Sequence, residues 1–213
     1  MSVKCRECEN EYDVIEYRDI PQLDDNHWSV IVAGSKRVFV RKFASEVAED
    51  PFKESGDTFL RFDIKLTDAE QMLARQVYKG KRHGVRVSLY RHSGDIWYRQ
   101  GSRQMPDEQW DVVHAAAVLI PHPDSLRYWR KLSRRKNGKS VAEQVREWAD
   151  SELDRYSAYC NGWFVDVAVS VTEAGACVDC VDVERLFLGP FYFNGDNAGD
   201  LEYIESSIKE MLG

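Results

Sequence analysis

The sequence predicts an α+β fold with a mostly antiparallel sheet and about three helices. Segments rich in β-branched and aromatic residues recur along the chain between turn-forming residues, which is typical of strands. Ser93-Gly94 joins two of these segments closely enough for a β-hairpin, and hairpins make antiparallel sheets. Thr67 and Ser140 each begin a Ser/Thr-x-x-Glu capping box that apolar residues follow at helical spacing.

The first part of the chain is expected to be mostly β-structure. Its apolar segments are separated by turn formers such as Pro21 and Gly34, and the polar segment 44–57 is expected to be a loop or a short helix. The predicted strands of this part are Tyr12–Arg18, Trp28–Ala33, Arg37–Phe43 and Thr58–Leu66.

Two helices are predicted from the capping boxes, in which Ser or Thr and Glu side chains satisfy backbone N–H groups. The first begins after Thr67 and ends at Gly80. The second begins after Ser140, has one apolar face, and stops at Asn161-Gly162. A third helix at the C-terminus is expected to have Asp200 as its cap and an inward face of Leu201, Ile204, Ile208 and Met211.

The remaining strands lie between and after these helices. Gly84–His92 alternates clearly and is expected to form a hairpin with Asp95–Gln100. Val112–Ile120 is almost entirely apolar and suits a buried central strand. Trp163–Val171 is expected to pair with segment 176–183 as a second hairpin.

Neither a low-complexity linker nor an internal repeat divides the sequence. We therefore expect one α+β domain over residues 1–213. A small N-terminal knuckle, residues 1–12, would pack on the C-terminal hairpin, so the N- and C-terminal segments should be adjacent.

The composition indicates a globular protein, since 43% of the 213 residues are hydrophobic and 12% are aromatic. No apolar run approaches the roughly 20 residues that cross a bilayer, and the N-terminus lacks the pattern of a signal peptide. These features lead us to expect a cytoplasmic protein without a membrane partner.

Four of the five cysteines form two Cys-x-x-Cys pairs, Cys5/Cys8 and Cys177/Cys180. This spacing lets two thiolates of one tight turn reach the same metal ion, and two such turns make a structural zinc site with bonds of about 2.3 Å. The odd number of cysteines argues against a disulfide framework. The alternatives are ordinary buried or surface cysteines, or a redox pair, although neither pair lies between a strand and a following helix.

A basic segment interrupts the acidic chain. The net charge is −7, yet residues 126–139 contain seven Lys or Arg and no acidic residue. Interleaved aromatic and guanidinium groups can stack on bases and pair with phosphates, so nucleic acid is one candidate partner. An acidic protein surface is another, and a solvated loop is the structural alternative. The candidate binding residues are Arg127, Trp129, Arg130, Lys131, Arg134, Arg135 and Lys136.

The stretch His92-Ser93-Gly94 contains residues that hydrolases use. A hydrolase also needs a base, an orienting acid and an oxyanion hole, and the sequence does not assemble them. Asp95 and Asp111 are candidates for the acid only because they are acidic. We expect a turn here and a protein that is not an enzyme.

Four motifs, in order over residues 84–195, resemble those of a family of uncharacterised bacteriophage accessory proteins. The first, "VSLYRHSG" (87–94), is similar to a Y-D-H-S-G motif of the family, and the second, "WDVVHAAAVLI" (110–120), has a W-D motif before an apolar strand. The third, "YSAYCNG" (156–162), has a Y-x-x-Y-x-x-G motif, and the fourth is "FLGPFYF" (187–193), which follows Cys177 or Cys180. The chain departs from the family at Arg91, where the motif has Asp, and at Val112-Val113, where it has Ser-Gly. The N-terminal cysteine pair is not a feature of that family.

The resemblance implies a phage or mobile-element origin and an accessory role in the cytoplasm of the host cell. Its implied partner is a host protein or protein complex, and its implied function is inhibition of a bacterial defence system such as CRISPR–Cas. This anti-defence role is the first hypothesis. A zinc-stabilised nucleic-acid-binding module that uses segment 127–139 is the alternative.

Overall fold

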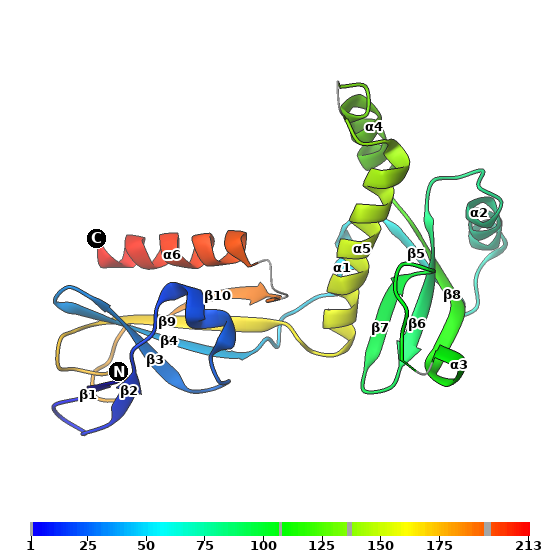
Figure 1. The fold of residues 1–213 in the computed structure, drawn as a ribbon. Helices are drawn as coiled ribbons and strands as arrows, with labels where there is room; N and C mark the ends of the chain where they lie inside the picture. Colours follow the sequence, from blue (N-terminus) through cyan, green and yellow to red (C-terminus); the bar gives the residue numbers. More distant parts are fainter. Residues whose placement is uncertain (1, 107, 136–137, 194–196) are drawn as a thin grey trace. The chain divides into compact units, whose positions relative to one another are not determined.

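The computed structural model describes residues 2–106, 108–135, 138–193 and 197–213, and its contacts divide the chain into two compact units (Figure 1). The terminal unit contains Met1–Ala48 and Gly162–Gly213, and the central unit contains Glu49–Asn161. The central unit is therefore inserted between two segments of the terminal unit. This differs from the single domain expected over 1–213, because each unit has its own sheet and its own hydrophobic core.

The main sheet of the terminal unit is antiparallel, in the strand order β10-β9-β4-β3. Its longest ladder joins β4 to β9, from the pair Lys36 and Glu173 to the pair Ala44 and Val165. The elements of this unit are β1 (Ser2–Lys4), β2 (Glu11–Asp13), η1 (Tyr17–Gln22), β3 (Trp28–Ala33), β4 (Lys36–Ala44), β9 (Val165–Glu173), β10 (Leu186–Phe191) and α6 (Ala198–Leu212).

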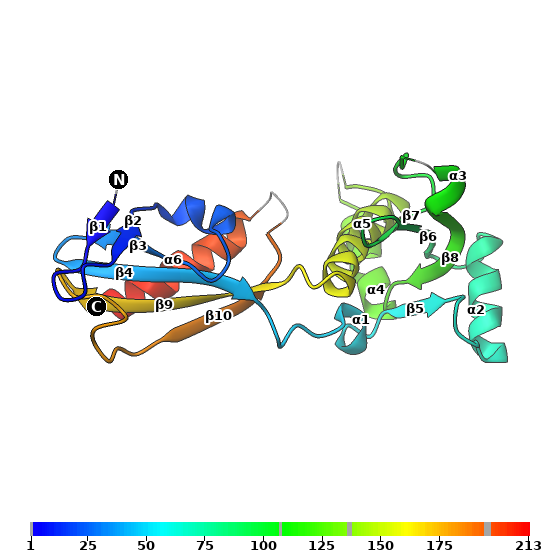
Figure 2. The same cartoon turned by 90° about the horizontal axis from the view of Figure 1, so that it is seen from below.

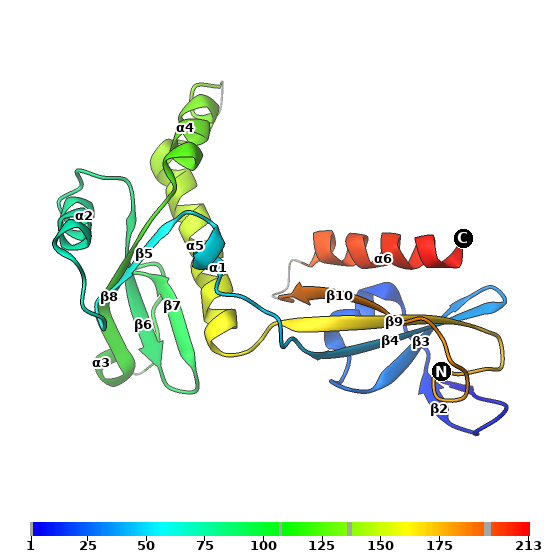
Figure 3. The same cartoon turned by 180° about the vertical axis from the view of Figure 1, so that it is seen from behind.

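The alternating side chains of β4 separate two apolar layers in the terminal unit. Val38 and Val40 pack in the cluster that contains buried residues of α6. Phe39, which lies between them, belongs to a different cluster with Cys5 and Cys177. Because successive side chains of a strand point to opposite faces, α6 covers one face of this sheet and the cysteine turns cover the other (Figure 3).

The sheet of the central unit is also antiparallel, in the order β5-β8-β6-β7. It contains the hairpin that Ser93-Gly94 predicts, formed by β6 and β7. The elements of this unit are α1 (Pro51–Glu54), β5 (Thr58–Arg61), α2 (Asp68–Tyr78), β6 (Val85–Arg91), β7 (Asp95–Arg99), α3 (Glu108–Asp111), β8 (Val112–Ile120), α4 (Pro123–Leu132) and α5 (Val141–Cys160).

Strand β8 is the buried central strand that its apolar sequence predicts. Ala117 and Leu119 pack in the cluster of α5, whereas Val118 and Ile120 pack in the cluster of α2. The same period of two therefore gives the central sheet a helix on each face (Figure 2).

Both capping boxes form as predicted. The N–H of Glu70 donates to Oγ1 of Thr67 at 3.3 Å, and the N–H of Glu143 donates to Oγ of Ser140 at 3.2 Å. Each glutamate in turn accepts from the backbone N–H of its Ser or Thr at 2.7 Å. Each box thus provides acceptors for two backbone N–H groups at the start of its helix that have no partner within the helix.

The number of helices was predicted wrongly. Within the described ranges there are seven, counting η1, where about three were expected. Three of the additional helices are short, and the fourth is α4 in the basic segment. Helix α4 begins with Pro123 at its first turn, and its half-buried Leu126 and Trp129 pack against the core of the central unit. Dense charge around these two apolar residues hid the helical pattern.

Three local predictions near the ends of the chain also differ from the structure. Of the first predicted strand, Tyr12–Arg18, only Tyr12 and Asp13 belong to a strand, β2, and the last two residues belong to η1. Segment 176–183 is a turn that carries a cysteine pair, so β10 and not this segment pairs with β9. Helix α6 starts at Ala198, which places Asp200 in the first turn and not at the cap.

The N-terminal segment and the segment around residues 177–180 are adjacent, as expected. Among the helices of the described residues, none combines the length and the apolar character needed to cross a membrane.

Candidate functional site

The two Cys-x-x-Cys pairs meet in the terminal unit. All four Sγ atoms lie within 4.8 Å of one another. The Sγ–Sγ distances are 3.7 Å from Cys5 to Cys180, 3.6 Å from Cys8 to Cys177, and 3.5 Å from Cys177 to Cys180. The prediction that the four sulfurs converge on one point is confirmed.

These separations fit one metal ion. Four sulfurs at the corners of a tetrahedron, each about 2.3 Å from a central ion, lie about 3.8 Å from one another. A disulfide would need about 2.05 Å, and the cysteines are free thiols. The cluster, named here the four-cysteine site, can hold a metal, and four thiolate ligands leave no open position for a substrate.

Two short turns bring the sulfurs together. In the turn between β1 and β2, the N–H of Cys5 donates to the carbonyl of Asn10 at 2.8 Å, and Glu9 has a left-handed φ of 63°. In the second turn, the N–H of Cys180 donates to the carbonyl of Cys177 at 3.2 Å. Each turn closes on itself through the backbone, so the two thiols of each pair point the same way.

Gly175 joins the two turns to each other. Its carbonyl accepts from the N–H of Arg6 at 3.0 Å, and its φ is +101°. A Cβ atom at this position would lie 2.9 Å from Cδ of Arg6. Glycine is needed here because the backbone is left-handed and the N-terminal turn packs directly against it.

A buried tyrosine supports the four-cysteine site from outside the ligand set. The hydroxyl of Tyr12 donates to Oδ2 of Asp179 at 2.7 Å, and Nδ2 of Asn10 donates to the same oxygen at 3.3 Å. Asp179 lies between the two cysteines of its pair, so these bonds tie the N-terminal turn to the C-terminal one. Tyr12 is the aromatic residue four positions after Cys8, and Asp179 is the residue directly before Cys180.

The thiols of the four-cysteine site differ in acidity. The backbone N–H groups of Cys8 and Glu7 lower the pKa of Cys5 to about 7, because they stabilise its thiolate. Hydrogen bonds with Cys8 and Cys177 raise the pKa of Cys180. Metals bind thiolates, so Cys5 is the first ligand available in its charged form near neutral pH.

Comparison of the chain with models of protein families, with curated proteins and with solved structures gives no match. The bacteriophage-family resemblance and the host partner that it implies stay predictions.

The basic segment lies in the central unit, partly on α4 and partly in the turn that follows. Trp129 is half-buried, and its ring is tilted against that of Trp148, with the two centroids 5.7 Å apart. Arg127 forms an ion pair with Asp124, and Lys139 pairs with Glu147 at 2.6 Å.

Four other cations of the segment are exposed and have no ion-pair partner within the described part of the chain; they are Arg130, Lys131, Arg134 and Arg135. Tyr128, beside them on α4, is 59% exposed. We call these five residues the α4 basic surface. Lys136, also predicted to bind, lies outside the described residues.

The hairpin at His92 has the geometry of a turn. A Cβ atom at Gly94 would lie 2.3 Å from Oδ1 of Asn161, whose side chain bonds both backbone groups of Asp95 at 2.9 Å. Nδ1 of His92 lies 2.9 Å from Oδ2 of Asp111. This pair is an exposed ion pair when His92 is protonated, and no nucleophile in the described residues is hydrogen-bonded to His92.

Proposed function

We propose that this chain is a zinc-stabilised nucleic-acid-binding protein, in which the α4 basic surface of the central unit contacts nucleic acid. The observation that carries the proposal is the group of four exposed cations without ion-pair partners on and after α4. Unpaired cations keep their full charge for phosphate groups, whereas cations already paired with carboxylates do not.

The distribution of charge between the units supports this proposal. The central unit has 20 Lys or Arg and 17 Asp or Glu, a net charge of +3. The terminal unit has 9 Lys or Arg and 19 Asp or Glu, a net charge of −10. A polyanion would therefore be attracted to the central unit and repelled by the terminal one. Arg130 and Lys131 lie in the last turn of α4, and Arg134 and Arg135 follow directly after the helix.

Zinc is the metal that we propose for the four-cysteine site. Four thiolates in a tetrahedron suit Zn²⁺ or an iron centre, and we propose zinc because two Cys-x-x-Cys turns with four cysteine ligands are typical of structural zinc sites. Metal analysis of the purified protein, with one zinc expected per chain, tests this part. Iron in place of zinc would contradict it.

The experiment for nucleic-acid binding is a titration of a labelled oligonucleotide at several salt concentrations. Removing two phosphate contacts by R134E/R135E should weaken binding and reduce the slope of log K against log salt by about 2. The matched control is K65E/R75E, which reverses two exposed cations of the same unit outside the α4 basic surface. Equal effects of the two double variants would contradict the proposal.

The alternative partner is a host protein or complex, as the phage resemblance implies, and the basic segment would then contact an acidic surface of that protein. In that case the chain binds no oligonucleotide at physiological salt, and it co-purifies with a stoichiometric host complex that R134E/R135E releases. The same pair of variants therefore separates the two functions.

A further inference from the structure

The outward side of α4 carries an exposed aromatic ring. Tyr128 is 59% exposed, whereas Leu126 and Trp129 pack against the core of the central unit. Tyr128 lies about 200° around the helix from Leu126, so its side chain points to solvent. Among the described residues, none stacks on its ring or shares a hydrogen bond with it. Both faces of the ring are therefore open to a stacking partner.

Unpaired cations accompany this ring at the end of α4. Lys131 is three residues after Tyr128, so the two side chains are neighbours on the helix surface. Arg134 and Arg135 follow directly after the helix. All three cations are exposed, and none has an ion-pair partner within the part of the chain that the structure describes. The ring thus lies beside positive charge that is free to meet phosphate.

Trp110 shows that exposure of a ring does not by itself make such a surface. It is 82% exposed, and it lies on α3 of the same unit together with the acidic residues Glu108 and Asp111. A phosphate group would be repelled by carboxylates at that position. Of these two exposed rings, Tyr128 is the one placed for contact with a nucleic acid.

The first turn of α4 offers no free positive charge. Its Asp124 forms an ion pair with Arg127, one turn further along the helix. A helix that lies in the major groove of a duplex has phosphates on both sides along its length. The free cations of α4 are confined to its last turn and to the residues that follow. This distribution suits one strand that crosses the end of the helix.

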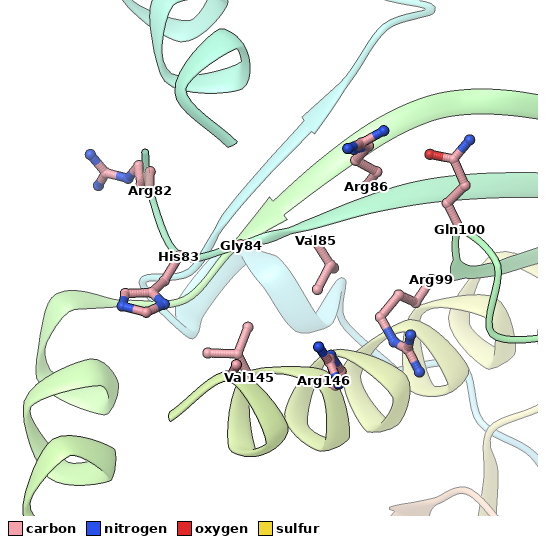
Figure 4. Close-up of a pocket in the computed structure, with 10 residues that line it drawn as sticks. Arg82, His83, Gly84, Val85, Arg86, Arg99, Gln100, Val145 and Arg146 are labelled. Carbon is pink, nitrogen blue, oxygen red and sulfur yellow. The ribbon is translucent and has the colours of Figure 1, made fainter. Parts of the chain in front are cut away.

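A cavity of about 470 Å³ beside β7 and the first half of α5 is also lined by arginines, but their charges do not converge on it (Figure 4). Arg86 lies over the ring of Tyr78, with its Cζ 5.1 Å from the centroid, on the face of the sheet opposite α5. Arg82 points away from the cavity, and Arg99 is already paired with both carboxylate oxygens of Asp150. The described lining contains no Phe, Tyr or Trp. The cavity therefore offers neither the free charge nor the ring that α4 offers.

We propose that the α4 basic surface binds single-stranded nucleic acid, with Tyr128 stacked on an unpaired base and the cations on the adjoining phosphates. This inference rests on the proposed nucleic-acid function and adds the class of strand. An aromatic side chain can stack only on a base whose face is open, and in a duplex each base is covered by its neighbours. The surface therefore selects the single strand through its ring.

Charge alone would give the opposite preference. A duplex carries one phosphate charge per about 1.7 Å of its axis, so ionic contacts by themselves favour it over a single strand. Tighter binding of the single strand needs a contact that is not ionic. Tyr128 is the aromatic residue of the α4 basic surface, so it is the residue that supplies this contact.

The test is a fluorescence-anisotropy titration of the full chain with a labelled oligonucleotide of mixed sequence, as a single strand and as a duplex. We expect the single strand, in DNA or in RNA, to bind about tenfold more tightly at equal salt. Tyr128→Leu should weaken single-strand binding about tenfold and leave duplex binding within about twofold. Its slope of log K against log salt should stay unchanged, because stacking releases no counterions, whereas R134E/R135E lowers the slope.

Two control variants isolate the ring. Tyr128→Phe keeps the ring and removes only the hydroxyl, so single-strand binding should stay within about twofold. Trp110→Leu removes the more exposed ring from its acidic surroundings and should change neither titration. Tyr128 and Trp110 are both exposed, so none of these variants is expected to unfold the unit.

Duplex binding as tight as single-strand binding, or equal losses in Tyr128→Leu and Trp110→Leu, overturns this inference and leaves the proposed nucleic-acid function standing. Equal losses in Tyr128→Phe and Tyr128→Leu also overturn it, because the hydroxyl and not the ring would then make the contact. If neither form of the oligonucleotide binds, the proposed function fails and this inference fails with it.

Discussion

The two units are built on the same plan but complete their cores differently. Each has a four-stranded antiparallel sheet whose alternating side chains form two apolar layers. In the central unit, α5 covers one face and α2 covers the other. In the terminal unit, α6 covers one face, and the opposite face, around Phe39 and Val30, is covered by the cysteine turns.

The difference shows what the four-cysteine site replaces. A sheet buries both faces only if another layer packs on each, and short turns bury too little apolar surface to be stable alone. A metal bound by four thiolates would stabilise such turns against the sheet, where the central unit has a second helix. The units also differ in net charge, −10 for the terminal unit against +3 for the central unit, and the nucleic-acid proposal concerns the central unit.

The largest expected effect is loss of the metal. Chelation, or Cys177→Ser at a fully buried ligand, should abolish the unfolding transition of the terminal unit and leave that of the central unit in place. The free energy of structural zinc binding is on the order of 10 kcal/mol, which is comparable to the whole stability of a domain.

Thermal denaturation followed by circular dichroism, with metal analysis of the same samples, measures this effect. Cys160→Ser is the control, because Cys160 belongs to the central unit and lies outside the four-cysteine site. Metal loss that melts both units together would show that they do not unfold independently.

The reciprocal change tests the central unit. Leu153 on α5 is fully buried, so Leu153→Ala should lower the free energy of unfolding of this unit by about 2–5 kcal/mol through a cavity. The metal content should stay unchanged. Denaturant unfolding measures the first quantity and elemental analysis the second, with Arg155→Ala on the exposed side of the same helix as the control.

A smaller effect is expected at the tyrosine that supports the four-cysteine site. Tyr12→Phe removes the 2.7 Å hydrogen bond to Asp179 and should cost the terminal unit about 1 kcal/mol, because Asp179 is exposed and water replaces part of the bond. Loss of such an outer contact typically weakens metal binding about 10–100-fold. Competition with a chromogenic chelator measures the affinity, and an unchanged affinity would remove Tyr12 from the support of the site.

The smallest effect is a pH dependence that belongs to the central unit. Hydrogen bonds from Thr67 and from Ser140 lower the pKa of Glu70 and of Glu143. A lowered pKa in the folded state adds stability that is present above the unfolded value of about 4.3 and is lost as the pH falls through the folded value. The melting temperature of the central unit should fall with acidification.

The double variant E70Q/E143Q checks this assignment. It removes both titrating carboxylates while keeping an oxygen that can accept the backbone hydrogen bonds. Its central unit should show a flatter dependence of melting temperature on pH between about 3 and 6. A profile that is parallel to that of the unaltered chain would assign the acid sensitivity to other groups.

Much of the local structure could be predicted because short stretches determine it. The strand Trp28–Ala33, the hairpin at Ser93-Gly94 and both capping boxes depend on neighbours within a few residues. Helix α4 was missed because its burial depends on contact with α5, which no local pattern of its charged residues shows. The boundary between the units was missed because no linker composition marks it, although the difference in charge between them does.

The sequence by itself determined which residues could serve as metal ligands, since two Cys-x-x-Cys pairs among five cysteines are a local and chemically specific pattern. Only the tertiary structure decided that the pairs meet, because more than 160 residues separate them and an entire unit is inserted between.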